Sequence, residues 1–148
     1  MASEFYTTRR IEFSDTDMAG IVHFSRFFVF MEVAEHAFLR SLSTSVSTEW
    51  EGNKIGWPRV SASCDYMSPA RFEEELDVHL RVIRKGEKSM TYGFSFHNNG
   101  TLVARGQLRS VCCVCNPGEK IRSIPIPNFI GHLIEEAPPE EDVNGASG

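Results

Sequence analysis

Apolar and polar residues alternate through much of the chain, which is the pattern of strands that bury one face. Strand-like patterning occurs in residues 7–13, 60–66, 76–82, 90–96 and 102–115. Short polar stretches that contain glycine separate the last three segments, at 84–88 and 98–100. Such stretches are typical of tight turns. The pattern therefore predicts an antiparallel meander within a sheet of at least five strands.

Residues 24–42 follow a different period, because apolar residues recur there every three or four positions. This spacing predicts a long helix. Phe30, Val33 and Ala37 occupy the other side of the helix, so we expect it to be apolar nearly all round and mostly enclosed. The predicted class is α+β, with the antiparallel sheet wrapped around the central helix. A short second helix is expected to begin at Pro127.

The segment 43–57 is mostly polar and contains both tryptophans, Trp50 and Trp57. This composition predicts a loop or lid. Both tryptophans could lie against the edge of the core, or at least one could line a ligand pocket. The sequence leaves these two interpretations open, and both residues remain candidates for substrate binding.

The length of 148 residues is typical of one domain. We place that domain at residues 1–136 and predict that residues 137–148 form an acidic, disordered tail. Up to residue 134 the chain carries 15 acidic and 15 basic side chains, so the net charge of −5 comes from the five acidic residues beyond. A neutral body lacks the broad basic face that nucleic-acid binding requires. A small-molecule substrate is favoured instead.

Other classes are excluded by the absence of their signals. No stretch approaches the ~20 apolar residues that span a bilayer, and the first ten residues lack the apolar segment of a secretory signal. We therefore expect a cytoplasmic protein that does not bind membranes. Three of the four cysteines, Cys112, Cys113 and Cys115, crowd one apolar run, which favours reduced thiols. No histidine has zinc-finger spacing relative to them, so no metal site is expected.

Residues 15–28 read DTDMAGIVHFSRFF and link the end of a predicted strand to the helix. They match the pattern D-[TC]-D-x-x-G-[IV]-V followed by an aromatic-rich helix start. This run resembles the 4-hydroxybenzoyl-CoA thioesterase type of hotdog-fold acyl-CoA thioesterases, and the order of elements agrees over residues 5–135. One difference is Phe24, where that family often has tyrosine. The resemblance implies a hotdog fold, acyl-CoA as substrate, no cofactor, and a homodimer or homotetramer with sites at the subunit interface.

The chemistry of thioester hydrolysis fits the same segment. The reaction needs a nucleophile or general base beside the carbonyl carbon, and donors directed at the developing oxyanion. Asp17 would face the carbon, and the free N–H groups near Phe24 and Ser25 would bind the oxygen. In the resembled family this aspartate acts as a nucleophile, through a mixed anhydride, or as a base for water. The sequence does not separate these roles.

Three neighbours of Asp17 have weaker assignments. We expect Asp15 to be structural, orienting the loop through backbone bonds. His23 is either a packed histidine or a group that positions the thioester, and we retain it as a catalytic candidate. Gly20 is expected to provide a backbone conformation closed to other residues or to allow close approach of the substrate.

Two further sets of residues are candidates for substrate binding. Arg84, Lys85 and Lys88 form a basic cluster at the turn 84–88, which would bind the phosphates of CoA unless it is only a solvated hairpin tip. On the predicted helix, Glu32 and His36 form a narrow polar stripe with Ser25.

Glu32 and His36 could bond to each other or to the sheet. In the resembled family, however, the position of Glu32 faces the acyl pocket. We therefore expect an acyl group that is aromatic or carries a polar end.

Two other functions remain as alternatives to an acyl-CoA thioesterase. A hotdog hydratase or dehydratase usually pairs histidine with aspartate or glutamate in a different motif, which this sequence lacks. A non-catalytic acyl-CoA or lipid-binding module would retain the fold without turnover, but the presence of Asp17 argues against it.

Overall fold

A computed structural model describes residues 1–140 of the chain. Its helices and strands are β1 (Glu4–Arg10), the 3-10 helix η1 (Phe13–Asp15), α1 (Arg26–Ser41), β2 (Thr48–Trp50), β3 (Asn53–Gly56), β4 (Arg59–Tyr66), β5 (Glu75–Lys85), β6 (Ser89–Asn98), β7 (Thr101–Val111), β8 (Cys113–Val114), β9 (Arg122–Ser123) and α2 (Asn128–Gly131).

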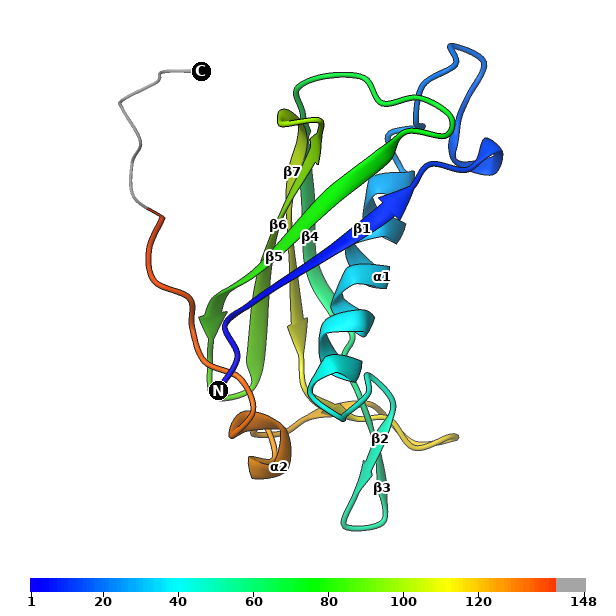
Figure 1. The fold of residues 1–148 in the computed structure, drawn as a ribbon. Coiled ribbons are helices and arrows are strands. Elements are labelled where there is room, and N and C mark those ends of the chain that lie inside the picture. The colour runs from blue at the N-terminus through cyan, green and yellow to red at the C-terminus, as the bar shows by residue number, and fades with distance from the viewer. Residues whose placement is uncertain (141–148) are drawn as a thin grey trace.

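The main sheet has five antiparallel strands in the order β1-β5-β6-β7-β4, and α1 lies across one of its faces (Figure 1). β5, β6 and β7 form the expected meander, since consecutive strands pair directly. Along β5, Leu76, Val78, Leu80 and Val82 are buried, whereas the residues between them are exposed or half-buried. This period-two pattern follows from the pleat of the strand. The predicted α+β class and antiparallel sheet are confirmed.

The core lies between α1 and the sheet. Phe30, Met31 and Phe38 project from α1 and are fully buried against sheet residues such as Phe96. Burial of each such side chain stabilises the fold by about 1.5–3 kcal/mol. The helix approaches β7 closely at Gly106, where a Cβ atom would lie 2.6 Å from Met31 Sδ. The same Cβ would lie 2.8 Å from the backbone oxygen of Ser63, which cannot move aside as a side chain can, so the space there favours glycine.

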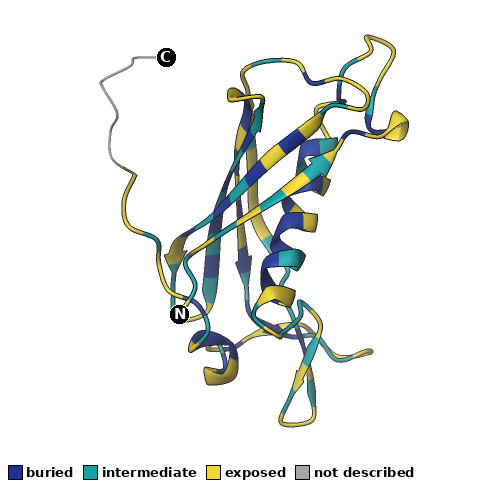
Figure 2. Cartoon of the chain, viewed as in Figure 1, coloured by how far each residue is buried: buried dark blue, intermediate teal, exposed yellow. Residues whose placement is uncertain are grey.

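The predicted extent and enclosure of the helix were wrong. α1 has 16 residues and begins at Arg26, because the preceding residues form a turn in which the Arg26 N–H donates to His23 O. Its outer side is exposed: Val29 and Val33 are 38% and 43% accessible, and Figure 2 shows this side of α1 in yellow. A single sheet covers only one side of a helix, so the apolar residues on the other side are left uncovered by residues 1–140.

The predicted loop or lid at 43–57 was also wrong in part, because it contains the hairpin β2-β3. This hairpin joins a second, small sheet with the order β2-β3-β8-β9. Trp50 and Trp57 are half-buried against the small apolar cluster around Ile55, Cys112 and Val114. The hairpin follows the C-terminal end of α1, so it lies at the end of the molecule away from the 15–28 segment (Figure 1).

The C-terminal part of the chain returns to the main sheet beside the N-terminus. α2 begins directly after Pro127, as expected. Ala2 donates to Leu133 O and accepts from the Glu135 N–H, each at 2.9 Å. Further on, the Ala137 N–H donates to Val82 O at 2.8 Å. Of the tail predicted at 137–148, residues 141–148 lie outside the described residues.

Two further findings concern the cysteines and the length of the helices. The four cysteines are free thiols. None of the helices within residues 1–140 is long and apolar enough to cross a membrane.

Candidate active site

Asp15 is the buried centre of the loop between β1 and α1. Its fully buried carboxylate accepts the Glu12 N–H at 2.9 Å and contacts the guanidinium groups of Arg26 and Arg9 at 2.8 and 3.3 Å. Burial opposes ionisation, but the bonds from Glu12, Arg26 and Arg9 outweigh it, so the pKa of Asp15 lies below its ordinary value. This geometry agrees with the structural role expected for Asp15.

Asp17 lies two residues further on, on an exposed tight turn. Its N–H donates to Ile21 O and its carbonyl accepts from the Gly20 N–H, both at 3.0 Å. Gly20 has φ of +79°, a left-handed conformation that favours glycine. Carboxylate oxygen Oδ1 accepts the Ala19 N–H at 2.8 Å. Within residues 1–140, Oδ2 has no hydrogen-bond partner, so one oxygen orients the group and the other faces solvent.

The peptide group between His23 and Phe24 marks the entry to α1. Its carbonyl, on His23, accepts the Arg26 N–H at 2.9 Å, which fixes the orientation of the whole group. The peptide is trans, so the Phe24 N–H points the opposite way, out of the N-terminal end of the helix. This N–H has no acceptor in the part of the chain that the structure describes. It is a free donor at the positive end of the helix dipole.

Tyr66, at the end of β4, also contacts this entry. Its hydroxyl donates to Phe24 O at 2.8 Å, and its ring packs edge-on against Phe27. Partial burial, together with the neighbouring Cys64 and Asp65, raises the pKa of Tyr66 to about 12, so the hydroxyl keeps its proton at neutral pH. Sequence reasoning missed this contact, because its partners are 42 positions apart.

Glu32 and His36 do not bond to each other. Glu32 is exposed and lies 3.3 Å from Arg59, while His36 Nε2 lies 3.7 Å from Glu35 Oε1. Arg59 links the two residues indirectly, because it contacts Glu32 and also Glu35, the neighbour of His36. It donates to the buried Glu35 carboxylate at 2.5 and 2.9 Å, and to Ser110 Oγ. Burial opposes the charge of Arg59, but its pairing with Glu35 outweighs this effect and raises the pKa of Arg59. The buried Arg59–Glu35 pair was not predicted.

The three basic residues predicted to bind CoA differ in their surroundings. Arg84 and Lys88 are exposed at the β5–β6 turn, whereas Lys85 Nζ donates to Gly131 O and Ile134 O at 2.6 and 2.9 Å. β5 begins beside the Asp15 loop and extends for roughly 30 Å at 3.3 Å per residue. The turn therefore lies at the opposite end of the sheet from Asp17 (Figure 1). Within one chain, Arg84 and Lys88 are therefore far from Asp17.

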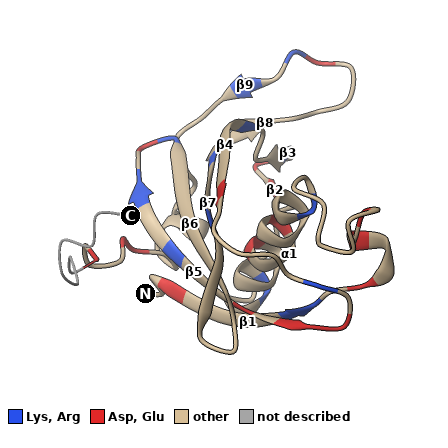
Figure 3. Cartoon of the chain, turned by 90° about the horizontal axis from the view of Figure 1, so that it is seen from above, with Lys and Arg blue, Asp and Glu red and all other residues tan. Residues whose placement is uncertain are grey.

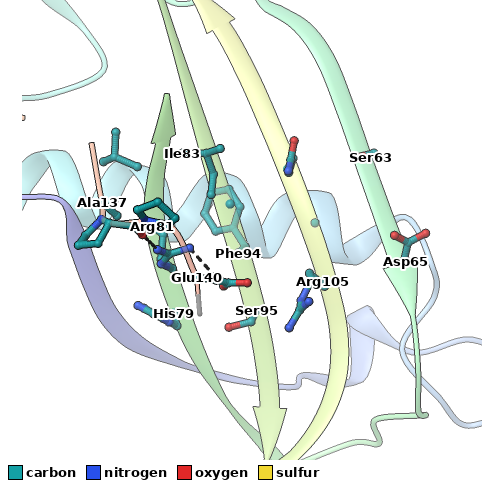
Figure 4. Close-up of a pocket in the computed structure, with 16 residues that line it drawn as sticks. Ser63, Asp65, His79, Arg81, Ile83, Phe94, Ser95, Arg105, Ala137 and Glu140 are labelled. Atoms are coloured by element: carbon teal, nitrogen blue, oxygen red, sulfur yellow. Dashed lines mark hydrogen bonds and ion pairs between the residues drawn. The ribbon is translucent and has the colours of Figure 1, made fainter. Parts of the chain in front are cut away.

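A cavity of about 500 Å³ lies on the face of the main sheet that points away from α1 (Figure 4). Arg81, Ser95, Arg105 and Glu140 line it, and Glu140 pairs with Arg81 at 3.2 Å. None of the predicted catalytic residues lines this cavity, so it is separate from the candidate site. β1 and β5 each begin with acidic residues and end with basic ones (Figure 3), so residues of opposite sign face each other across this antiparallel pair, as Glu4 faces Arg81.

No group of three His, Cys, Asp or Glu side chains within residues 1–140 is arranged to hold a metal ion. The groups available near Asp17 are a carboxylate oxygen and a backbone N–H, both without partners within residues 1–140. The N–H lies just before α1, on the loop segment that runs antiparallel to the one that carries Asp17.

Comparison with known proteins agrees with this geometry. The family model of the Thioesterase-like superfamily matches residues 11–134. The chain belongs to the thioesterase-like superfamily. The resemblance drawn from residues 15–28 and the predicted enzyme class, a thioester hydrolase, are thereby confirmed.

Relatives within the superfamily are similar over most of their length. A 1,4-dihydroxy-2-naphthoyl-CoA hydrolase from Synechocystis is 29% identical over 125 residues, which cover 83% of this chain and 90% of that protein. A solved gentisyl-coenzyme A thioesterase is 28% identical, with a TM-score of 0.75 over 86% of this chain and 99% of its own. A solved 1,4-dihydroxy-2-naphthoyl-CoA thioesterase from Synechocystis shares the fold, with 24% identity and a TM-score of 0.76 over 88% of this chain and 94% of its own. These neighbours confirm the hotdog fold.

The surroundings of Asp15 predict a specific loss of stability. Asp15→Asn should lower the free energy of unfolding at pH 7 by about 3 kcal/mol, because it leaves two guanidinium groups without their buried partner. The wild-type contribution is present above pH 3.8, the ordinary pKa, and is lost as the pH falls through the lower folded-state pKa. Urea denaturation of both proteins should therefore show a difference that shrinks below pH 3.8.

Glu75→Gln is the matched control, since Glu75 pairs with Arg10 on the exposed surface at 3.2 Å. We expect it to cost less than about 1 kcal/mol. Equal effects of the two substitutions would contradict the central role of Asp15.

Proposed function

We propose that the protein hydrolyses an aromatic or short to medium acyl-CoA to the free acid and CoA. The observation that carries the proposal is that one loop holds a carboxylate oxygen on Asp17 and an N–H on Phe24, neither of which has a partner within residues 1–140. Thr16 lies opposite Val22 in this loop, so the two groups come from adjacent antiparallel segments. A thioester between them would have its carbon near Asp17 and its oxygen near the start of α1.

Two routes are chemically balanced at this site. Asp17 can attack the carbonyl carbon, which forms a mixed anhydride and releases CoA as the thiolate; water then cleaves the anhydride, and the proton released in that step balances the protonation of the thiolate. Alternatively, Asp17 can take a proton from water while the hydroxide adds to the carbon and the thiol leaves with a proton. In both routes the Phe24 N–H binds the oxyanion, and the dipole of α1 favours the negative charge.

Removal of the Asp17 charge tests this assignment. Asp17→Asn should leave the melting temperature unchanged, because Asp17 is exposed, but lower kcat by at least ~10²-fold, since an amide neither attacks nor accepts a proton efficiently. Release of free thiol from a panel of acyl-CoAs measures the effect, with Asp77→Asn, an exposed aspartate on β5, as the control.

Full activity of Asp17→Asn would contradict the proposed chemistry. Binding of acyl-CoA by the native protein without thiol release would favour a non-catalytic binding module.

The surface of α1 supports an acyl group with a ring and a polar end. Phe28 and Glu32 are four residues apart on α1, so they share one side of the helix, and Phe24 lies in the turn just before its start. An aromatic ring could lie against the phenylalanines, with its hydroxyl directed to Glu32, which Arg59 holds in place. The relatives named above act on hydroxylated aromatic CoA esters, which agrees with this proposal.

A substrate panel tests the role of Glu32. The native protein should have a higher kcat/KM for hydroxyaryl-CoA than for aryl-CoA or medium-chain esters. Glu32→Gln should reduce the preference for the hydroxyl by about 10-fold or more, because it removes a charged hydrogen-bond partner. Glu49→Gln, an exposed glutamate on β2, is the control. Equal turnover of straight-chain esters, unchanged by Glu32→Gln, would exclude recognition of a polar end.

We further propose that the active form is a homodimer or a dimer of dimers. The exposed valines of α1 and the edge strand β4, which pairs only with β7, are surfaces that a second copy would cover. A second copy would also explain how Arg84 and Lys88 reach CoA. In a dimer, these two residues of one chain would bind the CoA whose thioester lies at Asp17 of the other chain. Lys85 would support the turn through its bonds to the end of α2.

Mixing two impaired variants tests this arrangement. Asp17→Asn and the double variant Arg84→Ala/Lys88→Ala, combined by unfolding and refolding together, form mixed dimers. One site of each mixed dimer then has both an intact Asp17 and an intact basic turn. At low substrate concentration, the mixture should be several-fold more active than either variant alone. Activity equal to the average of the two variants, or an active monomer by sedimentation, would contradict the proposal.

A further inference from the structure

The contacts of His23 determine which of its ring nitrogens carries the proton. Nδ1 lies 2.8 Å from Ser25 Oγ and accepts the Ser25 backbone N–H at 3.3 Å. A backbone N–H only donates, so Nδ1 must offer its lone pair. In the neutral ring the proton is then on Nε2.

Ser25 supports this assignment in a second way. It occupies the N-cap position of α1, where a serine side chain usually accepts a hydrogen bond from the backbone of the first helical turn. No such bond is made by Ser25. Its hydroxyl instead contacts Nδ1, and the hydroxyl must donate there because Nδ1 has no proton. The backbone of Ser25 is helical, with φ of −69° and ψ of −22°, rather than extended as in a capping residue, so its hydroxyl is available to His23.

The other ring nitrogen is unused. Within residues 1–140, His23 Nε2 has no hydrogen-bond partner, although the ring is half-buried and its centroid lies 4.5 Å from that of Phe24. The protonated Nε2 is therefore a second free donor at the entry to α1, beside the peptide group that carries the Phe24 N–H.

We propose that His23 acts as a hydrogen-bond donor through Nε2–H, and that Ser25 is the positioning residue that fixes this tautomer. The inference rests on the proposed hydrolysis at the same loop. The acceptor is the thioester carbonyl oxygen, which gains negative charge when the carbonyl carbon is attacked and loses it when the thiol leaves. His23 neither takes nor gives up a proton in this role, and proton transfer remains with Asp17 and water.

The tautomer is measured directly on the full chain by long-range ¹H–¹⁵N correlation NMR of histidine-labelled protein at neutral pH. His23→Gln identifies the His23 signals among the five histidines. We expect a pyridine-type Nδ1 and a pyrrole-type Nε2 in the native protein. Ser25→Ala should mix the tautomers, whereas Ser25→Thr, which keeps the hydroxyl, should restore the native pattern.

Kinetics then separate a donor from a base. His23→Leu should lower kcat by about 10²-fold with little change in KM, the usual effect of losing an oxyanion donor. His23→Gln, whose amide nitrogen also donates, should retain at least ten times the kcat of His23→Leu. Ser25→Ala should lower kcat by about 10-fold, the effect of one weakened hydrogen bond, and Ser25→Thr should recover it. Ser41→Ala, at the other end of α1, is the control.

Three results would overturn the inference. A proton on Nδ1 in the native protein would remove its basis. Equal loss of kcat in His23→Gln and His23→Leu would exclude the donor role. Failure of Ser25→Thr to recover kcat would exclude the positioning role of Ser25. Because the tautomer is measured without substrate, a failure of the proposed hydrolysis, seen as full activity of Asp17→Asn, is distinguished from a failure of the tautomer assignment.

Discussion

The buried carboxylate of Asp15 is the interaction on which the candidate site depends. It joins β1, through Arg9, to the first turn of α1, through Arg26. The loop between these elements must therefore close at a fixed place, and Asp17 and the His23–Phe24 peptide are carried on the two segments that leave this point. A charged group that would be costly to bury alone is satisfied by three donors. Structural charge pairing thereby holds the segment that carries the exposed carboxylate of Asp17, the group proposed to act on the thioester.

The partial coverage of α1 is the feature that favours the proposed association with a second copy. Its inner side packs on the sheet, and its outer side presents valines together with Glu32. The same lack of cover that made the prediction of an enclosed helix wrong leaves the proposed acyl surface open. In the proposed arrangement, contact with a second copy and binding of the acyl group would therefore both use the outer side of one helix.

The sequence predicted those features that depend on local periodicity. Alternation identified the meander, and the DTDMAGIV run indicated the loop before α1, in which Gly20 has the left-handed conformation that was expected. The helix was predicted too long because the apolar spacing extends back to Phe24, although the bond between Arg26 and His23 forms a turn there. Contacts between distant residues were missed for a different reason. The pairing of Arg59 with Glu35 depends on how strands are placed beside the helix, and periodicity along the chain carries no information on that placement.

The return of the C-terminal segment to β5 also protects the sheet. β1 pairs with β5 only as far as Arg81, so the last residues of β5 would otherwise present unpaired backbone groups. The carbonyl of Val82 is instead bonded by Ala137, and the N–H of Lys85 by the Glu136 side chain. Exposed backbone of this kind is where strands from separate molecules join and aggregate. Glu136 and Ala137 lie beyond residue 134, where the match to the family model ends. Their bonds cover this part of the sheet edge and so oppose its pairing with strands of other molecules.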